Sequence, residues 1–435
     1  MNTHIPDNII KKLNSIVFKF VWNNKERIKR SVLIGKFENG GAEMIHIESH
    51  FNSLKASWVK RIINSNSTWS IIGHNIINQF GGKDLLLRCN DSTIKYLNTI
   101  PPFYAAVFQA FIKINKKQIN DISSLHRLLN EPIWCNCNIQ YKNKTLYYRS
   151  WIDSNIIYIK DLHYIAGKLN EKFVYNKIAN KRNLWMEVFQ LKNALSRYKK
   201  LLTNFSFSNE DTLSPLITSS QLTTKEIYNI YITSIYVKPE MKIIQTRPSL
   251  TNINITDIAN SFLYRVKYMK DKKLAEFNFK VLHNTLVNGV YLSKWLDESR
   301  LQCSFCQAED DIIHMLYDCK INDNIWKIVG NNTKTNILVK HVIIGKTLIN
   351  TKNNKHIVYF NHCITIIAFI IYKYWLMTIH NDEAKNEKAL HCFMSTELNN
   401  KIKILCVYNY PADYAILNKI NNELKTYISL HYDPG

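Results

Sequence analysis

Four residues between positions 303 and 319 constrain the fold of this chain more than any other feature. Cys303, Cys306, His314 and Cys319 form the array Cys-x2-Cys-x7-His-x4-Cys. Three thiolates and one imidazole are donors that suit a tetrahedral Zn²⁺ site, and a Cys-x2-Cys turn brings two thiolates onto one ion. Because four protein ligands leave no position for water, the array predicts one structural zinc ion. The alternative is a chance or decayed arrangement of the same residues.

The charge balance favours a polyanionic partner. The 435 residues include 57 Lys and Arg against 34 Asp and Glu, so the formal net charge is +23. An excess of this size is most often found in proteins that bind nucleic acid. The chain is also crowded with Asn, Ile, Lys and Tyr, and AT-rich coding bias produces the same mixture. Part of the lysine excess can therefore reflect composition rather than function.

The cysteines and the apolar segments indicate where the protein works. The nine cysteines are an odd number and are scattered outside the array, which disfavours a disulfide framework and favours a reducing compartment, the cytoplasm or nucleus. The N-terminus does not read as a signal peptide. The most apolar run, Cys363 to Met377, is shorter than the ~20 residues of a membrane span and contains Lys373. We expect a buried helix there and no membrane partner.

The hydrophobic periodicity predicts a mainly α fold: a helical, multi-part architecture with short strands and a small zinc knuckle. An amphipathic helix is expected over 7–22, a short strand over Val32–Ile34, a turn at Gly40-Gly41 and a second helix from Phe51. Thr224 is expected to cap a later helix. The predicted segments are a helical segment 1–70, a helical connector 71–203, an irregular linker with a short helix 204–250, a helix with the zinc module 251–330 and a helical tail 331–435.

Two stretches resemble one protein family. The first contains Phe20-x-Trp22, a basic turn, Gly40-Gly41 and a helix with Ser57-Trp58-x-x-Arg61. This order resembles the stretch that follows the polymerase palm in LINE-type (non-LTR) retrotransposon reverse transcriptases. The second is the helix-forming EFNFKVLHNTLVNGVYLSKW, the Cys and His array and Trp326, which resemble the cysteine-rich C-terminal segment of the same family. The resemblance implies that 1–70 is thumb-like, and that the region grips a template–primer duplex by its backbone.

The catalytic centre of that family is not recognisable in this chain. Reverse transcriptases hold two metal ions on an aromatic-x-Asp-Asp motif in a β context. The single Asp-Asp pair, Asp310-Asp311, lies inside the zinc array with no aromatic residue two positions before it, and we interpret it as a solvated acidic turn. The chain is therefore expected to be no enzyme by itself and to use no small-molecule substrate. A missing polymerase palm in a longer product is a possible partner.

Three functions are compatible with these patterns. The first is binding of RNA and DNA, meaning a template–primer or element RNA, in which basic residues contact phosphates and two aromatic rings stack on bases. The candidate residues are Lys25, Arg27, Lys29, Arg30, Lys60, Arg61, Phe305 and Tyr317. The basic turn can equally be a solvated face, Phe305 can equally plug the knuckle core, and Trp326 is expected in the core. The second function is a decayed or domesticated remnant stapled by zinc, and the third is a zinc-organised protein–protein adaptor.

Overall fold

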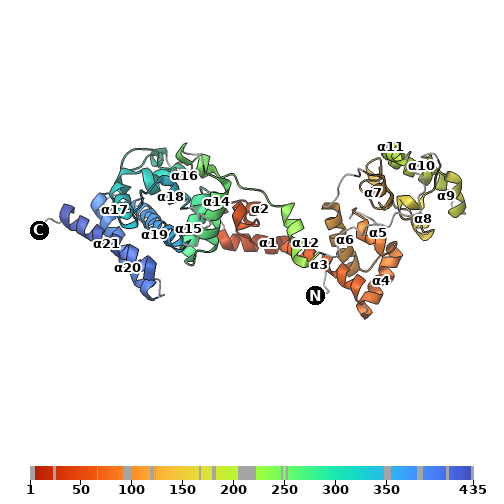
Figure 1. Cartoon of the computed structure of the whole chain (residues 1–435), viewed down its shortest axis with the longest axis horizontal. Helices are drawn as coiled ribbons and strands as arrows, with labels where there is room; N and C mark the ends of the chain where they lie inside the picture. Colours follow the sequence, from red (N-terminus) through yellow and green to blue (C-terminus); the bar gives the residue numbers. More distant parts are fainter. Residues whose placement is uncertain are drawn as a thin grey trace. The chain divides into compact units, whose positions relative to one another are not determined.

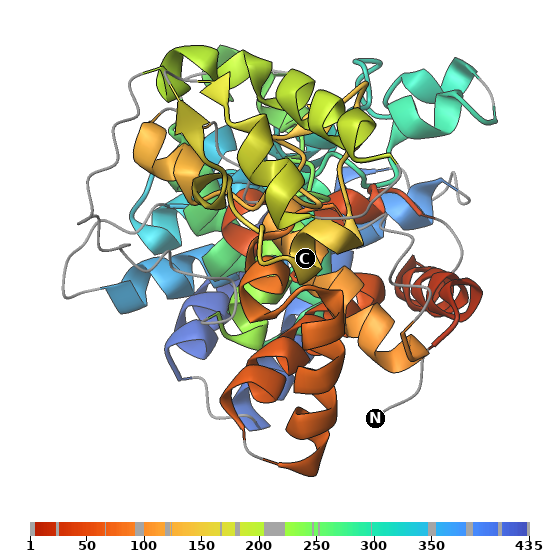
Figure 2. The same cartoon turned by 90° about the vertical axis from the view of Figure 1, so that its right-hand side faces the viewer.

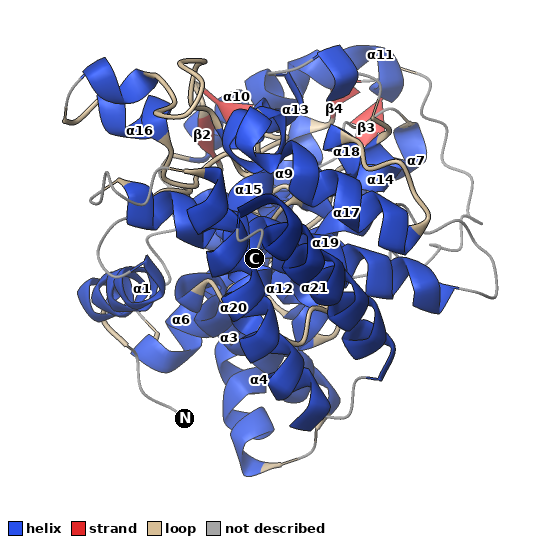
Figure 3. Ribbon diagram, turned by 90° about the vertical axis from the view of Figure 1, so that its left-hand side faces the viewer, coloured by secondary structure: helices blue, strands red, loops and turns tan. Residues whose placement is uncertain are grey.

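The chain is mainly helical, as the coiled ribbons of Figures 1 and 2 show. Among the described residues, the strands form two short antiparallel hairpins, β1 (Gln140–Tyr141) with β2 (Lys144–Thr145) and β3 (Tyr164–Ile165) with β4 (Lys168–Leu169), drawn in red in Figure 3. The prediction of a mainly α architecture with short strands is confirmed. The computed structural model describes residues 5–22, 26–65, 67–91, 100–117, 122, 124–165, 168–178, 183–203, 222–245, 248–250, 253–296, 298–346, 354–379, 386–407 and 411–432.

The chain folds into two units. Unit 1 comprises Met1–Asn24 and Ile45–Ile235, and unit 2 comprises Lys25–Met44 and Tyr236–Gly435. This division differs from the five segments expected from the sequence, because residues 25–44 fold with the C-terminal half of the chain. Within unit 2, Val237 N donates to Ser31 O at 3.2 Å, the Tyr236 hydroxyl donates to Asn39 O at 2.7 Å, and His283 Nε2 lies 2.8 Å from Gly40 O. Residues 204–221 of the expected linker lie outside the described residues.

Unit 1 is organised around α6 (Pro102–Lys117), which begins directly after Pro101. Its inner face is fully buried at Val107, Phe108 and Phe111. The Tyr231 hydroxyl donates to Ala110 O at 2.6 Å and ties α12 to this helix. The other helices are α1 (Asp7–Trp22), α3 (Ile47–Asn64), α4 (Thr68–Phe80), α5 (Lys83–Arg88), α7 (Leu125–Leu129), α8 (Arg149–Asp153), η3 (Ile159–Asp161), α9 (Glu171–Lys177), α10 (Leu184–Leu195), η4 (Ser196–Tyr198), α11 (Lys199–Leu202) and α12 (Thr224–Thr233).

Unit 2 is organised around α19 (Asn354–Thr378), whose residues Cys363, Ile364 and Ile367 are fully buried. Within it, His356–Thr378 is long and apolar enough to cross a membrane, but 61% of its most apolar stretch is buried inside the protein, as in a core helix. The remaining helices are α2 (Arg30–Leu33), η1 (Phe37–Asn39), α13 (Lys242–Gln245), η6 (Pro248–Leu250), α14 (Ile255–Ser261), the π-helix η7 (Phe262–Lys267), α15 (Lys272–Leu282), α16 (Gly289–Ser293), η8 (Glu298–Leu301), the π-helix η9 (His314–Asp318), η10 (Lys320–Asn322), α17 (Asp323–Thr333), α18 (Val339–Ile343), α20 (Glu387–Val407) and α21 (Pro411–Tyr432).

Two local predictions were wrong. The strand expected at Val32–Ile34 is a helical turn, α2, and all three side chains are buried. A short apolar run can form either structure, and here the Leu33 carbonyl accepts hydrogen bonds from Ala42 N at 3.0 Å and Met44 N at 3.1 Å instead of pairing in a ladder. Helix α12 is capped by Thr223 rather than by Thr224, in a capping box with Glu226.

The predicted turn at Gly40-Gly41 is confirmed, and each glycine has its own reason. Gly40 adopts a φ of 84°, a left-handed conformation that favours glycine. Gly41 packs against the backbone of Gly35, so that a Cβ at this position would lie 2.0 Å from Gly35 O. The turn therefore requires glycine at both positions, one for its backbone dihedral and one for close approach.

Candidate metal centre

The first two cysteines of the array lie on a tight turn between residues 301 and 310, which we call the knuckle. Cys303 N donates to Ala308 O at 2.7 Å, and Gln307 N donates to Cys303 O at 2.9 Å. Phe305 N points at Cys303 Sγ, 3.5 Å away. The turn closes because Gln307 adopts a φ of 62° in the left-handed region. This backbone path puts the sulfurs of Cys303 and Cys306 on the same side.

The other two residues of the array are brought together by a π-helical turn. In η9 the amide of Cys319 donates to the carbonyl of His314 at 2.9 Å, a bond that spans five residues instead of the four of an α-helix. Five residues along an α-helix correspond to a rotation of about 140° at 3.6 residues per turn, which would point the two side chains apart. The wider π turn brings residues five apart onto one face, so the His-x4-Cys spacing becomes a pair of adjacent ligands.

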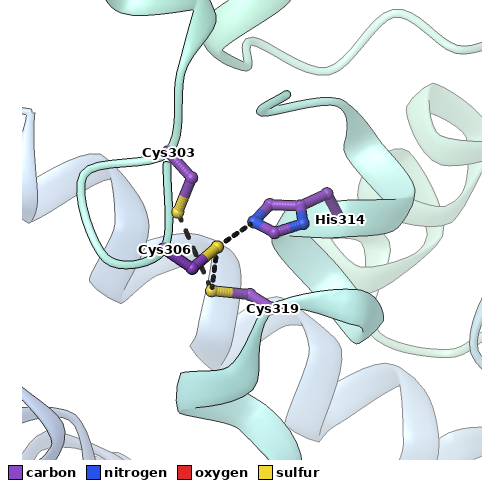
Figure 4. Close-up of side chains that lie close together, drawn as sticks. All are labelled: Cys303, Cys306, His314 and Cys319. Carbon is purple, nitrogen blue, oxygen red and sulfur yellow. Dashed lines mark hydrogen bonds between the residues drawn. The ribbon is translucent and has the colours of Figure 1, made fainter. Parts of the chain in front are cut away.

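The four side chains converge on one point (Figure 4). Cys303 Sγ lies 3.7 Å from Cys319 Sγ, Cys306 Sγ lies 4.0 Å from Cys319 Sγ, and Cys306 Sγ lies 3.2 Å from His314 Nε2. All four ligand atoms lie within 4.8 Å of one another. Metal–sulfur bonds of about 2.3 Å in a tetrahedron place the sulfurs about 3.8 Å apart. The geometry therefore fits a single metal ion bound by all four residues.

The cluster is shielded from solvent and favours a thiolate. Cys303, His314 and Cys319 are buried, and Cys306 is half-buried. The pKa of the Cys303 thiol is lowered to about 3, chiefly because the Cys319 thiol donates a hydrogen bond to its sulfur, with further help from the backbone amides of the knuckle. The same shared proton raises the pKa of Cys319. Since the thiolate is the form that binds metals, the turn is prepared for a cation.

The acidic pair next to the cluster is not the solvated turn that the sequence suggested. Asp310 is buried, with 4% of its surface exposed, and its Oδ2 accepts hydrogen bonds from the Trp375 indole at 2.9 Å and from Gly289 N at 3.1 Å. Burial, together with the neighbouring Cys303 thiolate, raises the pKa of Asp310 to about 7. Asp311 accepts from His314 N at 2.7 Å. The pair thus joins the knuckle to α16, α19 and η9.

The two aromatic candidates of the module pack within unit 2. Phe305 is half-buried, and its ring stacks on that of Tyr374 in α19 with the ring centres 6.5 Å apart. The Tyr317 hydroxyl donates to Ile337 O at 2.8 Å, and its ring lies beside Trp326. Trp326 is buried as expected, and its indole donates to Leu316 O at 3.0 Å. These contacts favour a packing role for Phe305 and Tyr317 over that of open stacking faces.

The predicted phosphate-binding residues are divided between the two units. Lys25 lies outside the described residues. In unit 2, Arg27 donates to Thr285 O at 3.0 Å and lies over the Tyr291 ring, and Arg30 forms an ion pair with Glu26 that raises its pKa. Lys29 is exposed. Lys60 and Arg61 are exposed on α3 of unit 1. The structure therefore leaves Lys29, Lys60 and Arg61 as the more accessible of these cations.

Residues that line a cavity beside Lys60 and Arg61 were missed by the sequence analysis. Trp69 and Phe103 contribute to this cavity, together with Trp58. Trp58 and Trp69 lie on the consecutive helices α3 and α4, but Phe103 lies on α6, so no spacing rule connects all three. A signal was nevertheless present, because Trp58 and Arg61 are three positions apart on a helix and such residues are neighbours. The guanidinium of Arg61 indeed lies 5.0 Å from the centre of the Trp58 ring.

The left-handed residue of the knuckle provides a local test of its geometry. A β-branched side chain is strained at a φ of 62°, so we expect Gln307→Val to destabilise the metal-bound protein by about 1–2 kcal/mol. Gln307→Gly, which relieves the strain, should leave the stability close to that of the natural protein. Thermal denaturation with the metal bound measures both variants. Equal midpoints for the valine and glycine variants would argue against this backbone conformation.

Comparison with models of known protein families and with curated proteins found no match for the chain. The assignment of function therefore rests on the residues and their geometry.

Proposed function

We propose that the chain is the non-catalytic C-terminal portion of a LINE-type retrotransposon reverse transcriptase, which binds RNA and DNA and holds one structural Zn²⁺. The observation that carries this proposal is the closed cluster of Cys303, Cys306, His314 and Cys319 in a chain of net charge +23. The order of the sequence features that resemble that family supports the same assignment. The thiolate ligands suit the reducing environment of the cytoplasm or nucleus.

Zinc is the metal that this donor set suits best. Thiolates select Zn²⁺, Cu⁺ and iron–sulfur clusters over harder cations, and the imidazole suits zinc. A tetrahedron of four protein ligands leaves no open position, which is the hallmark of a structural rather than a catalytic site. The ion would join the knuckle to η9, and Asp310 extends that connection to α19 through Trp375. We therefore assign the metal a role in holding the module in shape.

Nucleic-acid binding follows from the charge and from the accessible cations. Lys29, Lys60 and Arg61 are exposed, and none of them is in an ion pair among the described residues. Each phosphate contact by such a side chain releases a condensed counterion, so the affinity does not depend on base sequence and falls with salt. In a longer product, the polymerase palm would supply the catalytic carboxylates that this chain lacks.

The affinity for RNA is expected to fall steeply with salt. For single strands the logarithm of the binding constant falls by about 0.7 per phosphate contact for each decade of salt, so four contacts predict about a 50-fold loss between 50 and 200 mM. Fluorescence anisotropy with a labelled single-stranded RNA measures this slope. A peptide nucleic acid of the same sequence, which has no phosphates, is the control and should bind weakly at every salt concentration. A slope near zero for the RNA would refute the proposal.

A zinc-stapled protein–protein adaptor, derived from a decayed or domesticated element, is the second candidate. Trp295 is 75% exposed and Leu296 is 70% exposed, directly after α16, and α16 contacts the segment η8 that leads into the knuckle. Exposed large apolar side chains beside a rigid module are typical of protein interfaces. A pull-down after nuclease treatment separates the two functions, because an adaptor keeps its protein partners when the nucleic acid is removed.

A further inference from the structure

Unit 1 contains a cavity of about 740 Å³ that the proposed metal centre does not involve. It lies where the C-terminal turns of α3 meet the beginnings of α4, α6 and α12, and its lining includes the side chains of Trp58, Lys60, Arg61, Trp69 and Phe103. The volume is within the range of about 300–1,000 Å³ that is typical of small-ligand sites. The cavity combines aromatic rings with cationic groups.

The aromatic side of the cavity has one covered ring and one open ring. Trp58 is held edge-on against Phe103, with ring centres 5.6 Å apart, and Arg61 lies over its face. Trp69 is 57% exposed, although its backbone is anchored by a hydrogen bond from the Tyr104 hydroxyl to Trp69 O at 3.4 Å. The apolar surface of an exposed indole is in unfavourable contact with water, and a planar ligand that stacks on the ring buries that surface. The open ring is suited to a nucleobase.

The polar side of the cavity favours an anion. Lys60 and Arg61 are adjacent exposed cations, and neither is in an ion pair among the described residues. The carboxylate of Glu226 accepts hydrogen bonds from the backbone amide and hydroxyl of Thr223, each at 2.7 Å, which lower its pKa most, and the charge of Lys60 lowers this pKa further. Ser67 and Thr223, which precede α4 and α12, also line the cavity. The positive end of the α4 dipole therefore adds to the two side-chain charges, because α4 has no acidic residue in its first turn, whereas the N-terminus of α12 is occupied by Glu226.

We propose that this cavity binds one nucleotide of a single-stranded nucleic acid, with the base stacked on Trp69 and the adjoining phosphate held by Lys60 and Arg61. The inference rests on the proposed function and gives it a site. A nucleotide has a planar aromatic base and an anionic phosphate separated by a sugar. It therefore matches an open indole that lies beside two cations. A base inside a duplex is already stacked on both faces, so the site selects single strands.

The test measures the affinity of the full chain for a labelled twelve-residue oligouridylate. Trp69→Leu should weaken binding about 10-fold with an unchanged salt slope, because base–aromatic stacking contributes without charge. Trp69→Tyr, which keeps a stacking face, should recover most of that loss. Lys60→Gln with Arg61→Gln should weaken binding and reduce the salt slope by about 0.7, which corresponds to the loss of one phosphate contact.

Two matched controls remove the same groups elsewhere in unit 1. Trp185 on α10 is 59% exposed, and Lys199 and Lys200 are adjacent exposed lysines on α11. Trp185→Leu and the double variant Lys199→Gln with Lys200→Gln should leave affinity and slope nearly unchanged. If the control variants lose as much affinity as the cavity variants, or if the cavity variants bind like the natural chain, the cavity is not the site. Circular dichroism confirms that each variant folds.

The same experiment separates this inference from the function on which it rests. A natural chain that binds no oligouridylate at low salt contradicts both. A natural chain with a steep salt slope, combined with cavity variants that match it, contradicts the cavity alone. The last measurement is the affinity for free uridine monophosphate. We expect it to bind at least 10-fold more weakly than the oligonucleotide, because it lacks the neighbouring phosphates. Equal affinity would make the cavity a mononucleotide site and overturn the proposal for single strands.

Discussion

Replacing Cys303 with serine is expected to abolish metal binding and to loosen the knuckle and η9. The natural chain should carry one zinc per molecule, and the variant close to none. Structural zinc sites contribute about 10–16 kcal/mol of binding energy in isolated zinc-finger peptides, and this energy is also folding energy. Because the four ligands would join the knuckle to η9 through the metal, we expect the amides of residues 301–319 to lose hydrogen-exchange protection. Atomic absorption gives the stoichiometry, and exchange followed by mass spectrometry gives the protection.

Cys392→Ser is the matched control for this prediction. Cys392 is an exposed cysteine on α20 outside the cluster, so the same chemical change there should preserve both the zinc and the protection. Treating the natural protein with a strong chelator should reproduce the effect of Cys303→Ser without any mutation. A zinc content near zero in freshly purified, reduced natural protein would contradict the assignment of a structural zinc site. So would full exchange protection of the knuckle after chelation.

The candidate metal cluster could be predicted from the sequence because its four residues are close together in the chain. The spacing identified the four side chains that converge, whereas the π turn that makes His314 and Cys319 neighbours is visible only in the structure. The environment of Asp310 could not be predicted, since it is set by Trp375, 65 residues away, and by Gly289, 21 residues away. A short acidic pair looks solvated when such distant partners are unknown.

The basic turn at residues 25–30 shows the same contrast between partners that are close in the sequence and partners that are distant. The ion pair of Arg30 with Glu26 joins oppositely charged residues only four positions apart, so their proximity in the chain could have indicated it, although residues 26–29 precede α2 and are not helical. The hydrogen bond from Arg27 to Thr285 joins residues 258 positions apart, and no local pattern contains it. The helical turn at Val32 has the same origin, because burial in unit 2 decides between helix and strand for a run of apolar residues.

The interior of unit 2 also contains a buried arginine that no sequence pattern revealed. Arg265, on the π-helix η7, is 1% exposed. Its Nη1 donates to Val342 O at 3.0 Å and Ile343 O at 2.7 Å, and its Nη2 donates to Asn278 Oδ1 at 2.9 Å and Thr365 Oγ1 at 3.1 Å. Burial lowers the pKa of the guanidinium to about 9, so the group stays charged at neutral pH. One side chain thus joins η7 to α15, α18 and α19.

Arg265→Ala is therefore expected to destabilise unit 2 by about 3–5 kcal/mol, because it leaves a cavity and several buried acceptors without a donor. Arg265→Lys keeps a cation but loses the planar fork that reaches both sets of acceptors, so its loss should be smaller. Lys267→Ala, which removes a half-buried cation that lies two residues further along η7 and pairs with Glu43, is the control and should reduce the stability far less than Arg265→Ala. Urea denaturation, with hydrogen exchange of α15 to follow unit 2 alone, measures all three. Equal stabilities for the Arg265 and Lys267 alanine variants would show that the network does not hold the unit together.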